Sequence, residues 1–208
     1  MTKVKICGLK TLGDIEIVNK ALPDYIGFVF ADSKRKISKE LATLMKQALD
    51  QRIQAVGVFV NAPIEQIISL CKEQIIDCIQ LHGKESLDYV KELRAKVTNP
   101  IIYAKQVKME SNQAEFAQLE EYPVDYFLFD TYVKGIYGGS GKLINYQEIP
   151  ILNTPFFLAG GLNITNVEDA VIATHPYCVD VSSGVEIDGI KNEEKVIEFI
   201  HRIREMKG

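Results

Sequence analysis

The sequence lacks the features that would direct a protein out of the cytoplasm. No apolar run approaches the roughly 20 residues needed to cross a bilayer, and the charged N-terminal segment has no apolar core typical of a secretory signal peptide. The four cysteines are irregularly spaced and form no CxxC pair, which fits neither a zinc site nor the disulfide framework of a small secreted domain. We therefore expect a cytoplasmic protein with reduced thiols and no membrane partner.

The sequence also lacks a large excess of charge of either sign. The net charge is -4 and the lysine and arginine residues are scattered, so the chain has no basic stripe of the kind that neutralises nucleic-acid phosphates. No linker, low-complexity tract or break in composition divides the 208 residues. With 47% hydrophobic and 25% charged residues, the chain is expected to form one globular domain over residues 1–208 that binds no nucleic acid.

What the sequence does contain is a repeated pair of patterns. Short runs of β-branched and aromatic residues recur about every 25 residues, which is the length of one strand-plus-helix unit. These runs begin near Val4, Tyr25, Gln54, Ile76, Ile101, Tyr126, Phe156 and Cys178. Eight strands that alternate with helices predict a parallel sheet, because each crossover connection is helical.

Apolar stripes between the strand runs predict the helices. The stripes have the i, i+3, i+4, i+7 spacing of a helix and comprise Leu41, Leu44, Met45, Ala48 and Leu49, then Ile64, Ile67, Ile68 and Cys71. Ser38, Ser86 and Asn112 are predicted N-caps, and Thr165 with Glu168 is a predicted capping box. Glu193-Glu194 is predicted to lie in the first turn of the last helix. The weakest helical pattern spans residues 144–152, where Pro150 ends it early.

An open, doubly wound sheet is the alternative to a closed barrel. It would favour a glycine fingerprint after the first strand, but Gly8 stands alone there and Gly13 is wrongly spaced for one. We therefore predict a (β/α)₈ barrel of the α/β class, near the short end of the length range for this fold.

In a closed barrel, strand residues alternate between the lumen and the helical layer. The inward set is predicted to be Lys5, Cys7, Gly57, Phe59, Asn61, Gln80, His82, Leu128, Asp130, Asp180 and Ser182, with Val56, Val58 and Val60 facing outward. The polar members fall late in their strands, at the carboxyl-end mouth where barrel enzymes place catalysis. Any one of these polar side chains can be explained by a hydrogen bond inside the barrel. Their convergence at one end favours a functional site, because burying polar groups in the lumen lowers stability.

Glycines form a second group at the same predicted mouth. Gly160-Gly161 follows the seventh strand and Ser183-Gly184 follows the eighth, which is where many barrels bind phosphate through backbone N–H groups. Simple tight turns are the alternative interpretation, because glycine is the usual turn residue. Residues 138–141, Gly-Gly-Ser-Gly, suit either a flap over the ligand or a plain flexible loop.

A motif stands at nearly every predicted strand end: Lys5-Ile6-Cys7-Gly8, residues 56–61, Gln80-Leu81-His82-Gly83, Phe129-Asp130-Thr131, Gly139-Ser140-Gly141, residues 158–162 and residues 179–186. From residue 3 to about residue 200, these motifs together resemble the phosphoribosylanthranilate isomerase family of tryptophan biosynthesis. Each motif alone is weak, and the ordered set is specific. The resemblance implies a (β/α)₈ barrel that carries out the Amadori rearrangement of N-(5-phosphoribosyl)anthranilate without cofactor or metal.

The resemblance also implies roles for particular residues. Cys7 matches the family's general base, Asp130 its general acid, and Arg35 the arginine that binds the anthranilate carboxylate, although Lys34 stands where the family usually has proline. The substrate-binding set is completed by His82, Asp180 and the phosphate cradle of Gly160, Gly161, Ser183 and Gly184. Lys5 is expected either to tune the Cys7 thiol or to form a buried pair with an acid such as Asp180.

Two other functions compete with this interpretation. The histidine-pathway ribonucleotide isomerase shares the fold and the reaction type, but it carries an aspartate at the position of Cys7. A catalytically inactive barrel that serves as a scaffold is the rival from another class, and the presence of Cys7, Asp130 and both glycine turns argues against it. The expected partner is a small phosphoribosyl substrate, and the chain is expected to be a monomer or a homodimer.

Overall fold

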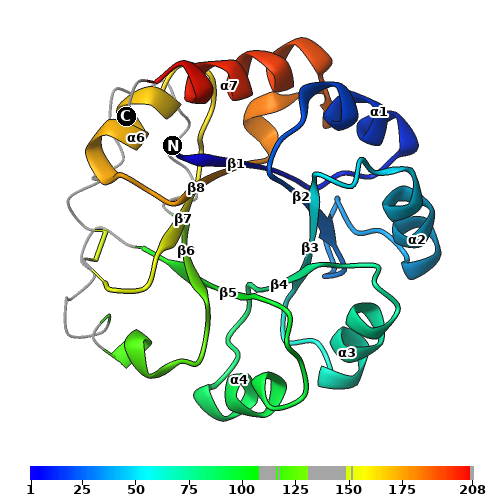
Figure 1. Ribbon diagram of the computed structural model, residues 1–208, viewed down its shortest axis with the longest axis vertical. Coiled ribbons are helices and arrows are strands. Elements are labelled where there is room, and N and C mark those ends of the chain that lie inside the picture. Colours follow the sequence, from blue (N-terminus) through cyan, green and yellow to red (C-terminus); the bar gives the residue numbers. More distant parts are fainter. Residues whose placement is uncertain (108–115, 117, 131–148, 151, 207–208) are drawn as a thin grey trace.

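The computed structural model describes residues 1–107, 116, 118–130, 149–150 and 152–206. Its centre is a closed barrel of parallel strands in sequential order, and helices surround the barrel (Figure 1). Strand β1 pairs with β2 on one side and with β8 on the other, which closes the sheet. The predicted (β/α)₈ barrel is therefore confirmed, and the open doubly wound sheet is excluded.

The strands begin almost where the sequence predicts them. Their bounds are β1 Lys3–Cys7, β2 Tyr25–Val29, β3 Gln54–Phe59, β4 Cys78–Leu81, β5 Ile101–Gln106, β6 Tyr126–Asp130, β7 Phe156–Ala159 and β8 Cys178–Val181. The largest displacement is at β4, which starts at Cys78 instead of near Ile76. A short antiparallel hairpin, β9 Glu186–Ile187 with β10 Ile190–Lys191, follows β8.

The helices cover the outside of the barrel. Their bounds are α1 Leu12–Ala21, α2 Lys39–Ala48, α3 Ile64–Lys72, α4 Leu87–Arg94, α6 Val167–Thr174 and α7 Glu193–Glu205, with single 3₁₀ turns η1 Gln118–Glu121 and η3 Ser183–Val185. No helix in these described segments is long and apolar enough to cross a membrane.

Helix starts were predicted with mixed success. Ser38 and Ser86 cap α2 and α4 through their side chains, as predicted. The capping box predicted at Thr165 and Glu168 is wrong, because the Thr165 hydroxyl donates to Asn163 instead and α6 begins one residue later, at Val167. The predicted cap at Asn112 and most of the weak helix at 144–152 lie outside the described residues.

The predicted apolar stripe of α2 is partly wrong. Leu44 is 55% exposed, and the buried face of the helix consists of Ala42 and Met45. In α3, Ile64 and Ile67 are buried as predicted, while Leu70 replaces Cys71 as the third fully buried position. Helical spacing alone thus located both helices but misplaced part of their inner faces.

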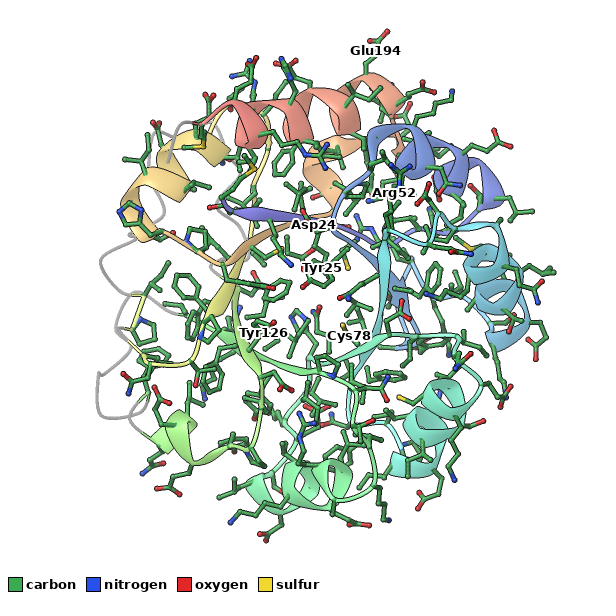
Figure 2. The ribbon with its side chains drawn as sticks, viewed as in Figure 1. Asp24, Tyr25, Arg52, Cys78, Tyr126 and Glu194 are labelled. Carbon is green, nitrogen blue, oxygen red and sulfur yellow. The ribbon has the colours of Figure 1, made fainter. Side chains whose placement is uncertain are left out.

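The buried side chains form two groups, one between barrel and helices and one inside the barrel. The inner group comprises Tyr25, Val56, Cys78, Ile102, Ala104, Leu128, Phe157, Ala159 and Cys178. Figure 2 shows Tyr25, Cys78 and Tyr126 within the ring of strands. The lumen is therefore filled by side chains and forms a core, as in other barrels of this size.

The predicted orientation of β3 is wrong. Val56 belongs to the inner group, whereas Ala55 and Phe59 pack in the outer group between barrel and helices. The register agrees, because Val58 lies beside the inward Gln80 of β4. This strand is buried on both faces, so its sequence shows no alternation from which the orientation could be read.

Candidate active site

Cys7 is the last residue of β1, and its thiol enters the lumen opposite Gly27 of β2. A methyl group at Gly27 would lie 2.6 Å from the Cys7 sulfur, so glycine is required there to leave room for the thiol. The Ser182 hydroxyl donates to the Cys7 carbonyl at 3.0 Å and ties the end of β1 to the loop after β8. The glycine leaves room for the thiol, and the hydrogen bond anchors the Cys7 backbone at the mouth of the barrel.

A buried ion pair lies one inward position below this thiol. Lys5 is fully buried and its Nζ donates to Asp180 Oδ2 at 2.8 Å, from adjacent positions on β1 and β8. Burial alone would lower the pKa of Lys5, but Asp180 and Cys7 together raise it, so the ammonium stays charged. Burial raises the pKa of the Cys7 thiol, and Lys5 offsets only part of that rise. The buried pair with Asp180, one of the two alternatives expected for Lys5, is therefore observed, and the same ammonium also offsets part of the rise in the Cys7 pKa.

Asp130 ends β6 on the inward side and faces His82, which lies just after β4. His82 Nε2 lies 3.6 Å from Asp130 Oδ2. The buried Gln80 side-chain amide donates to His82 Nδ1 at 2.9 Å. Since an amide N–H₂ can only donate, Nδ1 accepts in this contact, which leaves Nε2, the ring nitrogen beside Asp130, as the one that can carry a proton.

Two buried acceptors in this region have no hydrogen-bond partner within the described part of the chain. They are Gln80 Oε1 and Asp180 Oδ1. Both residues face the lumen, and buried acceptors without partners are rare in folded proteins. Their positions suit a ligand or water that brings O–H or N–H donors into the mouth. Gln80 was placed inward by the sequence pattern but was not among the predicted site residues.

Arg35, in the segment after β2, is held by a carboxylate from the hairpin. Its Nε and Nη2 donate to Glu186 Oε1 and Oε2 at 3.0 and 2.7 Å. Lys191 donates to the same Glu186 Oε1 at 2.7 Å and to the Ser182 carbonyl at 3.0 Å. Burial alone would raise the pKa of Glu186, but these hydrogen bonds outweigh burial and hold it at about 2.

Glu186 and Lys191 are site residues that the sequence analysis missed. A signal for them existed in the Asp188-Gly189 pair, since Asp-Gly between strand-forming residues, here two isoleucines, is typical of a two-residue hairpin turn. Both turn residues have positive φ, 52° and 77°. Such a turn pairs Glu186 with Lys191 across the two strands.

The predicted phosphate cradle occupies the loops after β7 and β8. Gly160 and Gly161 have φ of 99° and 66°, in the left-handed region that favours glycine. A methyl group at Gly184 would lie 2.0 Å from the Leu162 carbonyl oxygen, so the two loops lie directly against one another. The N–H groups of Gly161, Ser183 and Gly184 make no hydrogen bond to the described residues, and Gly161 and Ser183 are exposed.

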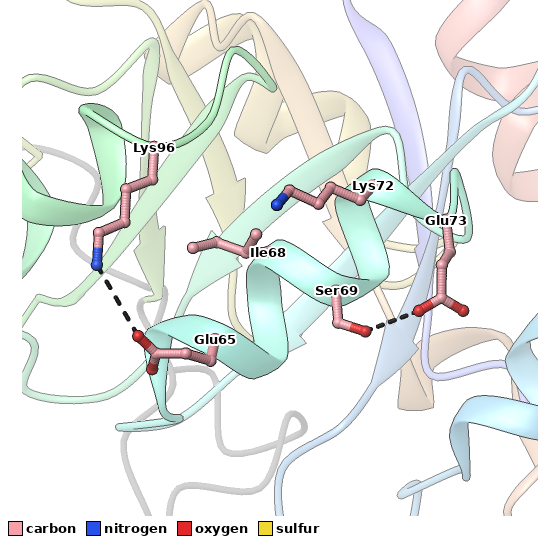
Figure 3. A pocket seen from close by; sticks show the side chains of 6 residues that line it. All are labelled: Glu65, Ile68, Ser69, Lys72, Glu73 and Lys96. Atoms are coloured by element: carbon pink, nitrogen blue, oxygen red, sulfur yellow. Dashed lines mark hydrogen bonds and ion pairs between the residues drawn. The ribbon is translucent and has the colours of Figure 1, made fainter.

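The Gly-Gly-Ser-Gly segment at residues 138–141, and Thr131, lie outside the described residues. A surface groove (Figure 3) is lined by Glu65, Ile68, Ser69, Lys72, Glu73 and Lys96. These residues come from α3 and from the segments after α3 and α4, not from strand ends, so the groove is separate from the mouth.

A closed parallel barrel with a thiol, a carboxyl group and an exposed glycine-rich edge at its carboxyl end has the architecture of a (β/α)₈-barrel enzyme. Comparison with known proteins identifies the family. The family model described as N-(5'-phosphoribosyl)anthranilate (PRA) isomerase matches residues 4–202. The chain therefore belongs to the N-(5'-phosphoribosyl)anthranilate isomerase family.

Individual relatives agree with this assignment. An N-(5'-phosphoribosyl)anthranilate isomerase from Endomicrobium trichonymphae is 45% identical over 99% of this chain and 100% of its own. The crystal structure of phosphoribosyl anthranilate isomerase from Thermotoga maritima superposes with a TM-score of 0.85 at 33% identity, over 98% of this chain and 99% of that one. A further isomerase structure, with a TM-score of 0.78 at 32% identity over 98% of this chain and 99% of that one, contains reduced 1-(o-carboxyphenylamino)-1-deoxyribulose 5-phosphate.

Proposed function

We propose that this chain catalyses the Amadori rearrangement of N-(5-phosphoribosyl)anthranilate to 1-(2-carboxyphenylamino)-1-deoxyribulose 5-phosphate in tryptophan biosynthesis. The observation that carries the proposal is the placement of Cys7 and Asp130 on the inward side of β1 and β6, both at the last residue of the strand. Such an arrangement puts a base and an acid around one bound sugar. Family membership specifies which sugar.

Asp130 is the general acid in this proposal. Its carboxyl group gives a proton to the furanose ring oxygen while the C1′–O bond breaks and the nitrogen lone pair forms an iminium ion. The resulting carboxylate faces the Nε2–H of His82 at 3.6 Å. His82 is therefore well placed to stabilise the negative charge that develops on Asp130 in this step.

Cys7 is the general base. Its thiolate takes the proton from C2′, and the C–H electrons form the C1′–C2′ double bond as the iminium nitrogen is neutralised. The enol-amine then tautomerises to the ketone when a proton reaches C1′ and the C2′ hydroxyl loses its own. A positioned acid or base typically contributes about 10²–10⁴-fold to such a step.

The remaining site residues bind the substrate. Backbone N–H groups of Gly160, Gly161, Ser183 and Gly184 suit the phosphate, and Arg35 suits the ring carboxylate, since a guanidinium binds carboxylates bidentately. The partnerless acceptor of Asp180 suits a sugar hydroxyl. No metal or other cofactor is required by any of these steps.

The setting of the reaction is part of the same proposal. We expect a single catalytic domain over residues 1–208 that works in the cytoplasm, as a monomer or a homodimer, on a small phosphoribosyl substrate. No nucleic-acid or membrane partner is needed for the chemistry.

A fluorescence assay tests the proposal directly. Phosphoribosylanthranilate is mixed with the purified protein, and the loss of its fluorescence is compared with the spontaneous rate, while chromatography identifies the product. Enzyme-dependent loss with the expected ketose product supports the proposal. A rate no faster than the spontaneous one would indicate a scaffold, and turnover only of the histidine-pathway ribonucleotide would indicate the rival isomerase.

A further inference from the structure

The contact between Arg35 and Glu186 leaves one edge of the guanidinium available. A guanidinium carries five N–H donors in a planar fork. Glu186 takes the edge formed by Nε and Nη2, while Nη1 donates to none of the residues that the structure describes. The outer edge, which consists of Nη1 and the second Nη2 hydrogen, can therefore bind another carboxylate through two parallel N–H···O bonds.

The position of Arg35 connects this edge to the reacting centre. Gly8 follows Cys7 with φ of 80°, and a methyl group there would lie 2.3 Å from the Arg35 Cδ atom. The arginine side chain thus crosses the backbone directly after the proposed base. It is 34% exposed, whereas the Glu186 side chain is only 6% exposed. Glu186 is hidden beneath the guanidinium, and the guanidinium faces the solvent.

Glu186 is itself held firmly in place. Its antiparallel partner Lys191 is buried, and the single Nζ of Lys191 donates both to Glu186 Oε1 and to the Ser182 carbonyl. Ser182 in turn donates to the Cys7 carbonyl. A continuous set of hydrogen bonds therefore runs from the backbone of the proposed base, through the hairpin, to the guanidinium.

We propose that Glu186, supported by Lys191, is the positioning residue that orients Arg35 toward an aryl carboxylate and thereby sets the preference of this site for ring-carboxylated amines. The inference rests on the proposed function and names a determinant of its substrate specificity. Glu186 does not touch the substrate and acts only through Arg35. Without it, the flexible arginine side chain would have to be ordered by the substrate itself, which costs conformational entropy on binding.

The test compares two ligands on the same variants. One ligand is the product reduced at its keto group, and the other is the same compound without the ring carboxylate. Dissociation constants for both are measured by calorimetry with the wild type, Glu186→Ala, Glu186→Gln, Arg35→Met and the double variant Arg35→Met/Glu186→Ala. Glu193→Gln is the matched control, because Glu193 forms an exposed ion pair with Lys20 on the outer surface.

Glu186→Ala should reduce the preference for the carboxylated ligand by about 5–20-fold, since a charge-assisted pair is weakened but not removed. Binding of the ligand without the carboxylate should change little, and the Ala substitution should have no further effect in the Arg35→Met background. Glu186→Gln, which keeps the shape and one acceptor, should lie between the wild type and Glu186→Ala. Glu193→Gln should match the wild type.

The inference is overturned if Glu186→Ala and Glu186→Gln weaken both ligands equally, which is the signature of a merely structural role, or if they leave the preference unchanged. If Glu186→Ala does not fold, Glu186→Gln decides alone. Turnover of phosphoribosylanthranilate by the wild type separates this failure from a failure of the proposed function. An active wild type with an unchanged preference rejects only the role of Glu186, and an inactive wild type that binds neither ligand rejects both.

Discussion

Lys5 on β1 and Asp180 on β8 form an ion pair of 2.8 Å inside the barrel, one inward position below Cys7. The pair places an ammonium close enough to the thiol to lower its pKa, although burial still leaves that pKa raised. The reactivity of the thiol is therefore set by two opposing effects that can be measured separately.

The first prediction concerns the pH dependence of Cys7. Because its pKa is raised, the thiolate fraction should climb by about tenfold per pH unit through the neutral range and into the alkaline range. The rate of alkylation by iodoacetamide, followed on the Cys7 peptide by mass spectrometry, should rise accordingly. In Lys5→Met the rise should move to higher pH, since a lowering influence is removed.

Cys71 provides an internal control for this experiment. Burial raises its pKa to about 11 without the influence of any lysine, so the pH dependence of its alkylation should be the same in the wild type and in Lys5→Met. A Cys7 alkylation rate that is already constant below pH 7 would show that the thiol is ionised in the free protein, contrary to this prediction.

The second prediction concerns catalysis by Cys7. Cys7→Ser replaces a readily ionised thiol with a hydroxyl that stays protonated near neutral pH. Turnover should fall by at least about 10²-fold, the lower end for loss of a general base, while the dissociation constant of the reduced product stays close to that of the wild type. Near-normal turnover in Cys7→Ser would remove Cys7 from the mechanism.

The third prediction concerns the anion site. Crystals soaked in phosphate or sulfate should hold an anion against the backbone N–H groups of Gly161, Ser183 and Gly184. Gly161→Ala should weaken it because φ at Gly161 is 66°, which is strained for alanine, and not because the methyl group clashes, since no atom lies within 4 Å of that position. Clear density that shows the cradle empty, with the anion bound elsewhere, would contradict the assignment.

The fourth prediction concerns stability in acid. Folding lowers the pKa of Glu186 to about 2, so its contribution to stability is complete above the ordinary carboxyl pKa near 4.3 and is lost as the pH falls toward 2. The expected contribution is roughly 2–3 kcal/mol. Denaturant unfolding of Glu186→Gln should show a lower free energy of unfolding at pH 7 and a flatter decline between about pH 4.5 and 2.

The surface variant Glu193→Gln is the control for this experiment. An exposed pair such as Lys20–Glu193 contributes about 0–1 kcal/mol, so its unfolding curve should follow that of the wild type. Identical pH profiles for the wild type and Glu186→Gln would show that the Arg35–Glu186–Lys191 contacts do not persist in solution.

The sequence predicted the barrel because the strand-plus-helix pattern repeats eight times and each strand start carries β-branched or aromatic residues. It predicted the inward direction of Cys7 and Asp180 because their strands alternate between apolar and polar residues. It failed for β3, where both faces are buried and the alternation disappears. It also failed at Thr165, because the Asn163 side chain competes for the threonine hydroxyl.

The contacts among Arg35, Glu186 and Lys191 were missed for a different reason. Arg35 and Glu186 lie 151 residues apart in the sequence, and no local pattern reports a contact at that separation. Only the Asp-Gly turn indicated that Glu186 and Lys191 face each other. The contact between Glu186 and Arg35 depends on the pairing of β1 with β8, which closes the barrel. That closure brings the segment after β2 and the segment after β8 together beside Gly8.

The most direct test of the proposed chemistry is the steady-state kinetics of Asp130→Asn beside Arg35→Met, with phosphoribosylanthranilate as substrate. Asparagine keeps the size of Asp130 but cannot deliver a proton, so kcat should collapse with a modest change in KM. Arg35 contacts the carboxylate in both ground and transition states, so Arg35→Met should mainly raise KM, by about 10–100-fold. If Asp130→Asn changed only KM while Arg35→Met abolished kcat, the roles of the two residues would be reversed.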